Sequence, residues 1–240
     1  MYSFNSRIRY SECDENETLT ITSLLNYFQD CSTFQSEDLG VGVKALKNAG
    51  TLWVINYWQI DVIRMPHLCD EVTIHTRPYE IRGFFGKRNF YMKDERGDFL
   101  AKADSLWTYL SIKEGTPVRI PERLMEVYSP MEKLDMDYTG RKISIPAEAS
   151  RKELTPIVVN EHMLDVNHHV NNGKYVEIAT LLLSRPENFS RLRVEYRKQA
   201  FLEDVMYPVL YESDQGKIVF LGDKDGKPFS IVEFSGTRND

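Results

Sequence analysis

The 240-residue sequence has no run of about 18 consecutive apolar residues, the length that a membrane-spanning helix requires. Its first residues contain no apolar core of the kind found in secretory signals. Cysteine is scarce, and the widely spaced Cys13, Cys31 and Cys69 form neither a zinc-type nor a redox pair. With a net charge of −6, the chain lacks the positive charge expected of a protein that binds nucleic acid in bulk. These absences predict a cytoplasmic protein with reduced thiols, no membrane span and no nucleic-acid partner.

Two distant segments follow the same order of elements, which indicates an internal duplication. Residues 7–34 and 156–183 each begin with a short strand-like stretch, continue through a polar loop and end in an apolar helix. The apolar faces of these helices are predicted to hold Leu24, Phe28 and Cys31 in the first and Tyr175, Ile178, Ala179 and Leu182 in the second.

Each predicted helix is followed by β-rich segments. The predicted strands are 72–79, 86–91 and 103–112 in the first half and 205–211, 217–221 and 229–236 in the second. In each half a Gly-containing turn of the kind that joins hairpin strands precedes the last strand, at 93–99 and at 222–229.

The pattern predicts an α+β fold in which an antiparallel sheet wraps around a long helix. This is the hot-dog arrangement, here present twice in tandem. Residues 1–127 are expected to form the N-terminal domain and residues 155–240 the C-terminal domain. Residues 128–154 are rich in charge, contain proline and glycine and show no periodicity, so they are interpreted as the linker.

The polar side chains most suggestive of chemistry stand directly before the second helix. Asp165, Asn167 and His169 occupy alternate positions, so on an extended backbone they would project to one side. Asn171 or Asn172 then suits the helix N-cap, where a side chain accepts a backbone N–H. Because a helix N-terminus concentrates N–H donors, it also favours a nearby oxyanion.

The string Asp-x-Asn-x-His-Val-Asn-Asn-x-Lys-Tyr over 165–175 resembles the active-site motif of the acyl-acyl-carrier-protein thioesterases of plants and bacteria. The segment EYRK at 195–198 resembles the strand that follows in that family. The segment RYSECDENETLTITSLLNYFQD at 9–30 is also typical of it. The resemblance therefore covers nearly the whole chain. It implies a double hot-dog hydrolase that releases free fatty acid from acyl carrier protein in fatty-acid biosynthesis, with no cofactor and no metal.

The resemblance also implies roles for individual residues. Asp165 would be the base or the nucleophile and His169 the proton shuttle, and Asn167 with the helix amides would hold the carbonyl. The family's fourth site residue is a Glu, followed in plant enzymes by Cys, and these positions fall on Gln199 and Ala200. Gln199 is therefore expected to position water, since neither a thiol nor a second carboxylate is present.

The repeat suggests one active site per chain. Pairing Tyr27 with Tyr175 gives an offset of 175 − 27 = 148, which places the polar trio on Glu17, Leu19 and Ile21. The first half would then lack the amide and the imidazole and be free to shape an acyl pocket. Trp53 and Tyr57, in an apolar strand, are interpreted as core residues or as the lining of that pocket.

Several alternatives stay open. His162, His168 and His169 with Asp165 could bind zinc, although adjacent histidines point apart on an extended chain. Two basic clusters could dock an acidic carrier protein. They are Arg82, Lys87, Arg88 and Lys93 in the first half, and Arg191, Arg193, Arg197 and Lys198 in the second. His67 and His75 are expected to be structural.

Three functional hypotheses remain from the sequence. The leading one is a thioesterase acting on acyl carrier protein, the second is an acyl-CoA thioesterase, and the third is a non-catalytic acyl-binding hot-dog protein. Fold alone does not separate them, whereas the polar trio favours catalysis. A homodimer is possible.

Overall fold

The computed structural model describes residues 1–183 and 188–238, which form two compact units. The first contains Met1–Asn56 and Ile63–Tyr138, and the second contains Tyr57–Val62 and Thr139–Asp240. This division differs from the predicted domain boundaries. Six residues of a strand in the first half of the chain belong to the second unit, and the predicted linker is divided between the two units.

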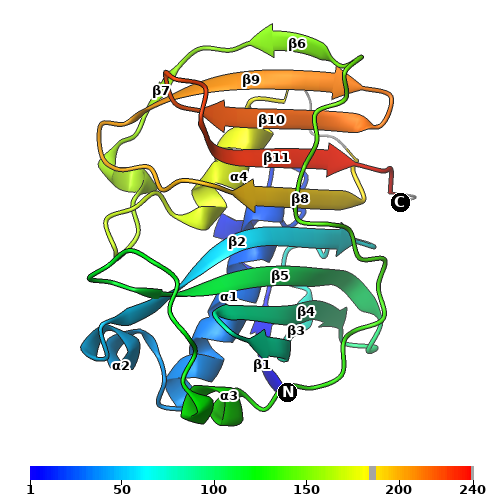
Figure 1. Ribbon diagram of the computed structural model, residues 1–240. Helices are drawn as coiled ribbons and strands as arrows, with labels where there is room; N and C mark the ends of the chain where they lie inside the picture. Colours follow the sequence, from blue (N-terminus) through cyan, green and yellow to red (C-terminus); the bar gives the residue numbers. More distant parts are fainter. Residues whose placement is uncertain (184–187, 239–240) are drawn as a thin grey trace. The chain divides into compact units, whose positions relative to one another are not determined.

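The first unit has one strand before its main helix and four after it (Figure 1). Its elements are β1 (Tyr2–Arg7), the 3-10 turn η1 (Tyr10–Glu12), α1 (Ile21–Asp38), α2 (Val43–Asn48), β2 (Thr51–Val62, of which 51–56 lie in this unit), β3 (Glu71–Arg82), β4 (Phe85–Asp94), β5 (Phe99–Ser111) and α3 (Glu122–Tyr128). The strand order is β1-β3-β4-β5-β2, and the pairs β1–β3, β3–β4 and β4–β5 are antiparallel.

Helix α1 packs its predicted apolar face against this sheet. It begins after Thr20, whose hydroxyl accepts the N–H of Ser23 at 3.2 Å. Leu24, Phe28 and Cys31 are fully buried, as predicted, and the ring of Phe28 lies 5.6 Å from that of Phe90 on β4. Burying a Leu or Phe side chain stabilises a fold by about 1.5–3 kcal/mol, so this face holds the helix on the sheet.

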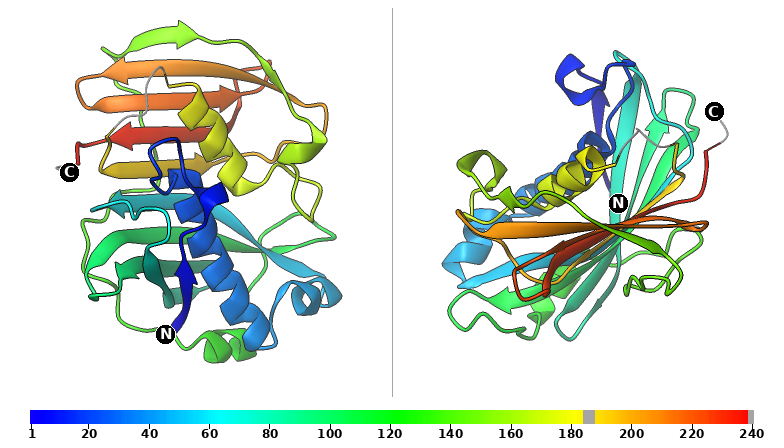
Figure 2. Two further views of the ribbon diagram at one scale, coloured as in Figure 1. Left: turned by 180° about the vertical axis from the view of Figure 1, so that it is seen from behind. Right: turned by 90° about the horizontal axis from the view of Figure 1, so that it is seen from above.

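The second unit repeats this order. Its elements are residues 57–62 of β2, β6 (Ser150–Glu153), β7 (Ile157–Val158), η2 (Glu161–Met163), α4 (Asn172–Leu181), β8 (Arg191–Tyr196), β9 (Val205–Ser213), β10 (Gly216–Gly222) and β11 (Pro228–Ser235). The strand order is β2-β8-β11-β10-β9-β6, and β7 pairs with β9. Seen from behind, each main helix lies across the strands of its own unit (Figure 2).

Helix α4 packs against β10 and β11. Tyr175, Ile178 and Ala179 are buried, as predicted, whereas Leu182 is the half-buried C-cap residue beyond the helix. None of the helices in the described part of the chain has the length and apolar character that crossing a bilayer demands.

The predicted linker, residues 128–154, is anchored by buried polar side chains of the strands. In the first unit, Asn89 accepts the N–H of Leu134 at 2.9 Å and the hydroxyl of Tyr138 at 3.1 Å. The same stretch also contains β6, which pairs with β9. The segment predicted to be the linker is therefore anchored along its length, because partners distant in sequence satisfy its polar groups.

In the second unit the same segment rests on β2 and β8. Gln59 accepts the N–H and the hydroxyl of Thr139, at 2.9 and 2.8 Å, and Glu195 accepts the N–H of Ile143 at 3.1 Å. Gln59 and Glu195 are both 0% exposed. Buried polar groups of this kind stabilise a structure only when they are paired, so they fix the path of the segment.

A buried carboxyl on β5 belongs to the network around Asn89. Asp104 accepts the Tyr79 hydroxyl at 2.9 Å and an Asn89 amide N–H at 3.4 Å. Burial raises the pKa of Asp104 to about 6, although the Tyr79 hydrogen bond and the charges of Lys133 and Lys87 act in the opposite direction.

This raised pKa predicts that Asp104 lowers stability as pH increases. Below about pH 4 the carboxyl is protonated in both the folded and the unfolded state, whereas between about pH 4 and 6 only the unfolded state ionises freely. We expect Asp104→Asn to approach wild-type stability at pH 4 and to exceed it by about 2–3 kcal/mol above pH 7. Urea denaturation across this range measures the difference, with the exposed Asp98→Asn as control. A difference that does not change with pH would contradict the assignment.

Candidate active site

The loop between η2 and α4 carries the predicted polar trio and is a closed turn. The N–H of Asp165 donates to the carbonyl of His169 at 2.8 Å, and the N–H of His168 donates to the carbonyl of Asp165 at 3.0 Å. Leu164 and Val170 form a β-bridge across its base. The backbone is therefore not extended at residues 165–169, so the condition under which the three side chains would project to one side is not met.

The carboxylate of Asp165 holds this turn from inside. Its Oδ1 accepts the N–H of Asn167 at 2.7 Å and the N–H of His169 at 3.3 Å. His168 adopts φ 61°, a left-handed conformation that costs energy for a residue other than glycine. The carboxylate thus fixes the backbone on which Asn167 and His169 stand.

The first unit contains the same turn with different side chains. Asp14 Oδ1 accepts the N–H of Asn16 at 2.9 Å and that of Thr18 at 3.1 Å, and Glu17 adopts φ 59°. The structural offset between the units is therefore 165 − 14 = 151, and the offset of 148 is wrong. Equivalent positions are Asp165 with Asp14, Asn167 with Asn16 and His169 with Thr18. The first unit keeps the acid and the amide and lacks the imidazole only.

Helix α4 starts at the end of this turn. Asn171 is the N-cap and accepts the N–H of Gly173 at 2.8 Å. Of the two residues predicted as candidates for the cap, Asn171 and Asn172, it is therefore the first that serves. A helix N-terminus next to the turn places backbone N–H donors beside the polar side chains.

Two tyrosines, buried Tyr175 and half-buried Tyr196, hold the segment after β8 against the same helix end. Tyr175 on α4 accepts the N–H of Ala200 at 3.0 Å, and Tyr196 on β8 donates to the carbonyl of Asn172 at 2.9 Å. Burial raises the pKa of Tyr175 to about 12, so it remains a neutral phenol at ordinary pH. The sequence marked Tyr175 only as a core residue.

The segment of Gln199 therefore borders the turn. Val170 donates its N–H to the carbonyl of Ala200 at 2.9 Å, and the ring of Phe201 meets that of His169 edge-on at 4.9 Å. The structure brings together the turn, the start of α4 and residues 199–201. Asp165 and His169 are half-buried, whereas Asn167 and Gln199 are exposed. Phe201 was missed by sequence analysis, because nothing local marks it as a partner of His169.

Trp53 and Tyr57 lie in two different environments. Trp53 packs against the buried cluster of Tyr109, Ile120, Leu124 and Tyr128 in the first unit. In the second unit, the Tyr57 hydroxyl lies 2.8 Å from that of Thr139, and Tyr57 is 2% exposed. The contacts of both residues are those of packed core and of the anchored segment. Their role in an acyl pocket remains a prediction.

The basic clusters are largely engaged in internal contacts. Arg88 is buried rather than on the surface, so it is removed from the predicted docking cluster. In the second cluster the ion pairs are Arg191–Asp61, Arg193–Glu233, Arg197–Glu195 and Lys198–Asp223. Arg197 and Lys198 are nevertheless exposed and lie next to Gln199.

The two histidines of the first unit have structural contacts. His67 Nδ1 lies 3.3 Å from the hydroxyl of Thr18, and His75 stacks on Tyr91 at 4.4 Å. Over residues 1–183 and 188–238, no three His, Cys, Asp or Glu side chains are grouped as metal ligands.

An antiparallel sheet packed against one main helix in each unit defines this chain as an α+β hot-dog protein. The chain belongs to the acyl-ACP thioesterase family, because the model of the acyl-ACP thioesterase N-terminal domain matches residues 1–128, more than half of its length. The fold and family predicted from the sequence are thereby confirmed.

Two plant relatives are similar over most of this chain. A chloroplastic acyl-acyl-carrier-protein hydrolase of Cuphea viscosissima is 27% identical over 221 residues, which cover 84% of this chain and 52% of that protein. A chloroplastic palmitoyl-acyl carrier protein thioesterase of Gossypium hirsutum is 28% identical over 233 residues, covering 89% and 55%. The chain thus spans about half the length of the curated relatives it matches.

Solved structures agree on the fold. An acyl-ACP thioesterase from Bacteroides thetaiotaomicron has a TM-score of 0.87 at 19% identity, covering 97% of this chain and 96% of that one. A putative oleoyl thioesterase from Lactobacillus plantarum has a TM-score of 0.84 at 26% identity, covering 100% and 97%.

The two equivalent turns allow a matched test of stability. We expect Asp165→Ala and Asp14→Ala each to lower the free energy of unfolding by about 1–3 kcal/mol, because each change removes two hydrogen bonds to a charged carboxylate. The loss should be larger for half-buried Asp165 than for exposed Asp14. Chemical denaturation measures both, and wild-type stability in either variant would contradict the role of its carboxylate.

Proposed function

We propose that this chain hydrolyses the thioester between a fatty acyl group and acyl carrier protein, releasing free fatty acid. The observation that carries the proposal is the turn of Asp165, Asn167 and His169 at the N-terminus of α4, with residues 199–201 beside it. Family membership and the activities for which the two plant relatives are named support the same reaction. The acyl-CoA and non-catalytic alternatives have no comparable support.

The chemistry follows from the positions of the side chains. Asp165 Oδ1 is occupied by two backbone N–H groups, and its Oδ2 has no hydrogen-bond partner among the described residues. Oδ2 is thus the atom available either to take a proton from attacking water or to attack the carbonyl itself. Asn167 and the N–H groups at the start of α4 would hold the developing oxyanion.

His169 would complete the proton transfer. When the carbon–sulfur bond breaks, the departing thiolate needs a proton, and a half-buried imidazole beside the turn can donate it. Phe201 packs against one edge of this ring. Water supplies the hydroxyl of the acid product, so no redox partner and no cofactor are needed.

The carrier protein would approach the exposed cations next to the site. Arg197 and Lys198 lie on the segment that leads to Gln199, and an acidic partner could compete for their charges.

A cytoplasmic location and a homodimer remain predictions. The three cysteines are unpaired, which fits a reducing compartment, whereas the two plant relatives are named as chloroplastic.

The first functional test separates catalysis from turn stability. We expect Asp165→Ala and His169→Ala each to lower turnover of acyl carrier protein substrates by at least about 10²-fold, typical of losing a general acid or base. Asp14→Ala and Thr18→Ala change the equivalent positions of the first unit and should keep wild-type turnover at temperatures where they stay folded. Thiol release measures all four, and near-normal turnover in His169→Ala would refute the assigned site.

The second test addresses the position where the chain departs from its family. A Gln side chain holds water through one donor and one acceptor but is no base near neutral pH. Gln199→Ala should therefore lose about tenfold in turnover, the equivalent of one hydrogen bond. Gln199→Glu should remain active with a shifted pH–rate profile, because a second carboxylate raises the pKa of one member of the pair. If Gln199→Ala matches wild type at every pH, residue 199 takes no part.

A further inference from the structure

One hydrogen bond beside the candidate site joins two residue types that the first unit lacks at the equivalent positions. The Tyr175 hydroxyl accepts the N–H of Ala200 at 3.0 Å, and the two residues are 3% and 0% exposed. The carbonyl of Ala200 accepts the N–H of Val170 at 2.9 Å, so both backbone groups of Ala200 are fixed, one by α4 and the other by the turn. Because the peptide bond is planar, this also fixes the carbonyl of Gln199, which belongs to the same peptide group as the Ala200 N–H.

The segments that follow β2 and β8 match residue by residue. In each, an aspartate accepts the N–H three residues earlier at 2.9 Å and follows a residue in the left-handed conformation. The two aspartates are Asp70 and Asp204, so the offset is 204 − 70 = 134, which pairs Pro66 with Ala200. The carbonyl of Pro66 also accepts a turn N–H at 2.9 Å, from Leu19, as the carbonyl of Ala200 does.

The position of the tyrosine in its helix has an equivalent as well. Tyr175 is the fourth residue of α4 and Leu24 the fourth of α1, which agrees with the offset between the turns, 175 − 24 = 151. Leu24 carries no hydroxyl and Pro66 no N–H, so the first unit lacks the acceptor and the donor together. It nevertheless forms the same turn and the same segment after its strand. The hydrogen bond between Tyr175 and Ala200 is therefore an addition to the fold and not a requirement of it.

We propose that Tyr175 is a positioning residue whose hydroxyl holds Gln199 in place beside the turn, a role that rests on the proposed hydrolysis. The unit that has this hydroxyl is the unit that has the imidazole of His169. Within the part of the chain that the structure describes, no hydrogen bond fixes the exposed Gln199 amide, so its backbone anchor sets where that amide lies. A side chain that holds water for the reaction must keep a defined position.

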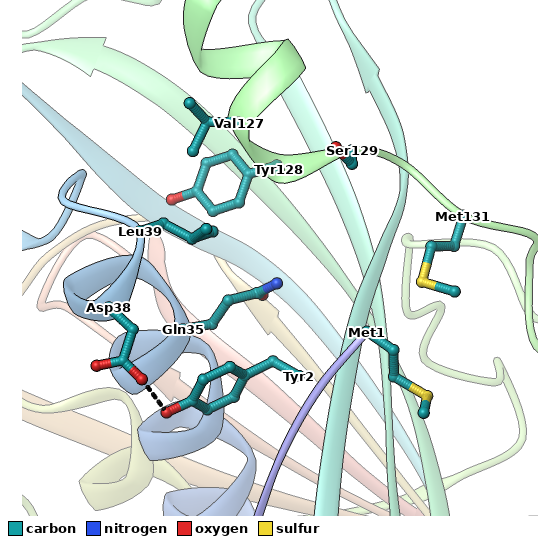
Figure 3. Close-up of a pocket in the computed structure, with 9 residues that line it drawn as sticks. All are labelled: Met1, Tyr2, Gln35, Asp38, Leu39, Val127, Tyr128, Ser129 and Met131. Carbon is teal, nitrogen blue, oxygen red and sulfur yellow. Dashed lines mark hydrogen bonds between the residues drawn. The ribbon is translucent and has the colours of Figure 1, made fainter.

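Tyr175→Phe keeps the ring and deletes the acceptor. We expect it to lower kcat for thiol release from acyl carrier protein substrates about tenfold with KM unchanged, because the lost interaction concerns water and not the acyl group. The matched control is Tyr128→Phe in the first unit. Tyr128 lies in the wall of a cavity of about 340 Å³ (Figure 3), is 5% exposed, and its hydroxyl lies 3.0 Å from that of Ser36. The control should keep wild-type kcat, and wild-type kcat in Tyr175→Phe would overturn the proposal.

Two combined variants separate positioning from stability. Tyr175→Phe with Ala200→Pro removes both partners, as in the first unit, so no buried polar group is left unpaired and wild-type stability is expected in urea denaturation. Its kcat should still be about tenfold below wild type. Tyr175→Phe in a Gln199→Ala background should cause no further loss, since both changes act through the same water. Recovery of wild-type kcat in the first variant, or a further tenfold loss in the second, would overturn the proposal.

Amide hydrogen exchange, read without substrate, keeps this inference apart from the proposed hydrolysis. The Ala200 N–H should exchange at least about tenfold faster in Tyr175→Phe than in wild type, whereas the Val170 N–H, which donates to the carbonyl of Ala200, should keep its rate. Unchanged exchange at Ala200 would overturn the inference. A wild-type protein that releases no thiol would refute the hydrolysis instead and leave the exchange result as it stands.

Discussion

The contact between the Asp165 carboxylate and two backbone N–H groups is the constraint on which the candidate site depends. It closes the turn, brings Val170 to the carbonyl of Ala200 and lets α4 begin at the cap of Asn171. The ring of His169 then lies against Phe201, and residue 199 lies beside the turn. Without this contact the polar side chains would stand on a loop with no fixed geometry, and site residues need defined positions to act together.

The same turn occurs in the hairpins of both units, so the turn alone is no sign of function. Asp94 and Asp223 each accept the N–H groups two and four residues later through Oδ1. In these hairpins the left-handed position is a glycine, Gly97 or Gly226, as the sequence predicts for such turns. In the turns that precede α1 and α4, the left-handed position is occupied by Glu17 and His168, and this conformation is strained for residues other than glycine. What distinguishes the turn of the second unit is the imidazole of His169, four residues after the aspartate, where the first unit has Thr18.

Much of the fold could be predicted because its signals are local. The helix faces around Phe28 and Tyr175 follow from apolar spacing, and the hairpin turns follow from glycine at the required conformation. The register of the repeat could not be predicted in this way. Tyr27 and Tyr175 are similar side chains, but they stand at positions that are not equivalent in the structure. The turn itself is a matter of backbone hydrogen bonds, which residue alternation does not reveal.

The environments of buried polar residues were equally beyond the sequence. Gln59, Asn89 and Glu195 anchor the segment 128–154 through partners 45 to 80 residues away in the chain. No pattern near these three residues in the sequence indicates that segment as their partner. Arg88 stood in a run of charges that reads as solvent-exposed, yet the fold buries it beneath Tyr128. Such placements depend on tertiary packing, which overrides local composition.

The central claim is that the chain holds one acyl carrier protein site, at the turn of the second unit. Nuclear magnetic resonance of the histidine rings tests it directly, with a carrier protein whose acyl chain is joined by an amide in place of the thioester. Each unit has one histidine at this contact. In the second unit His169 belongs to the turn and Phe201 packs against it, whereas in the first unit Thr18 belongs to the turn and His67 lies against it. The account predicts that the ring signals of His169, assigned with His169→Gln, shift on binding while those of His67 stay in place. A shift of His67 with His169 unchanged would contradict it.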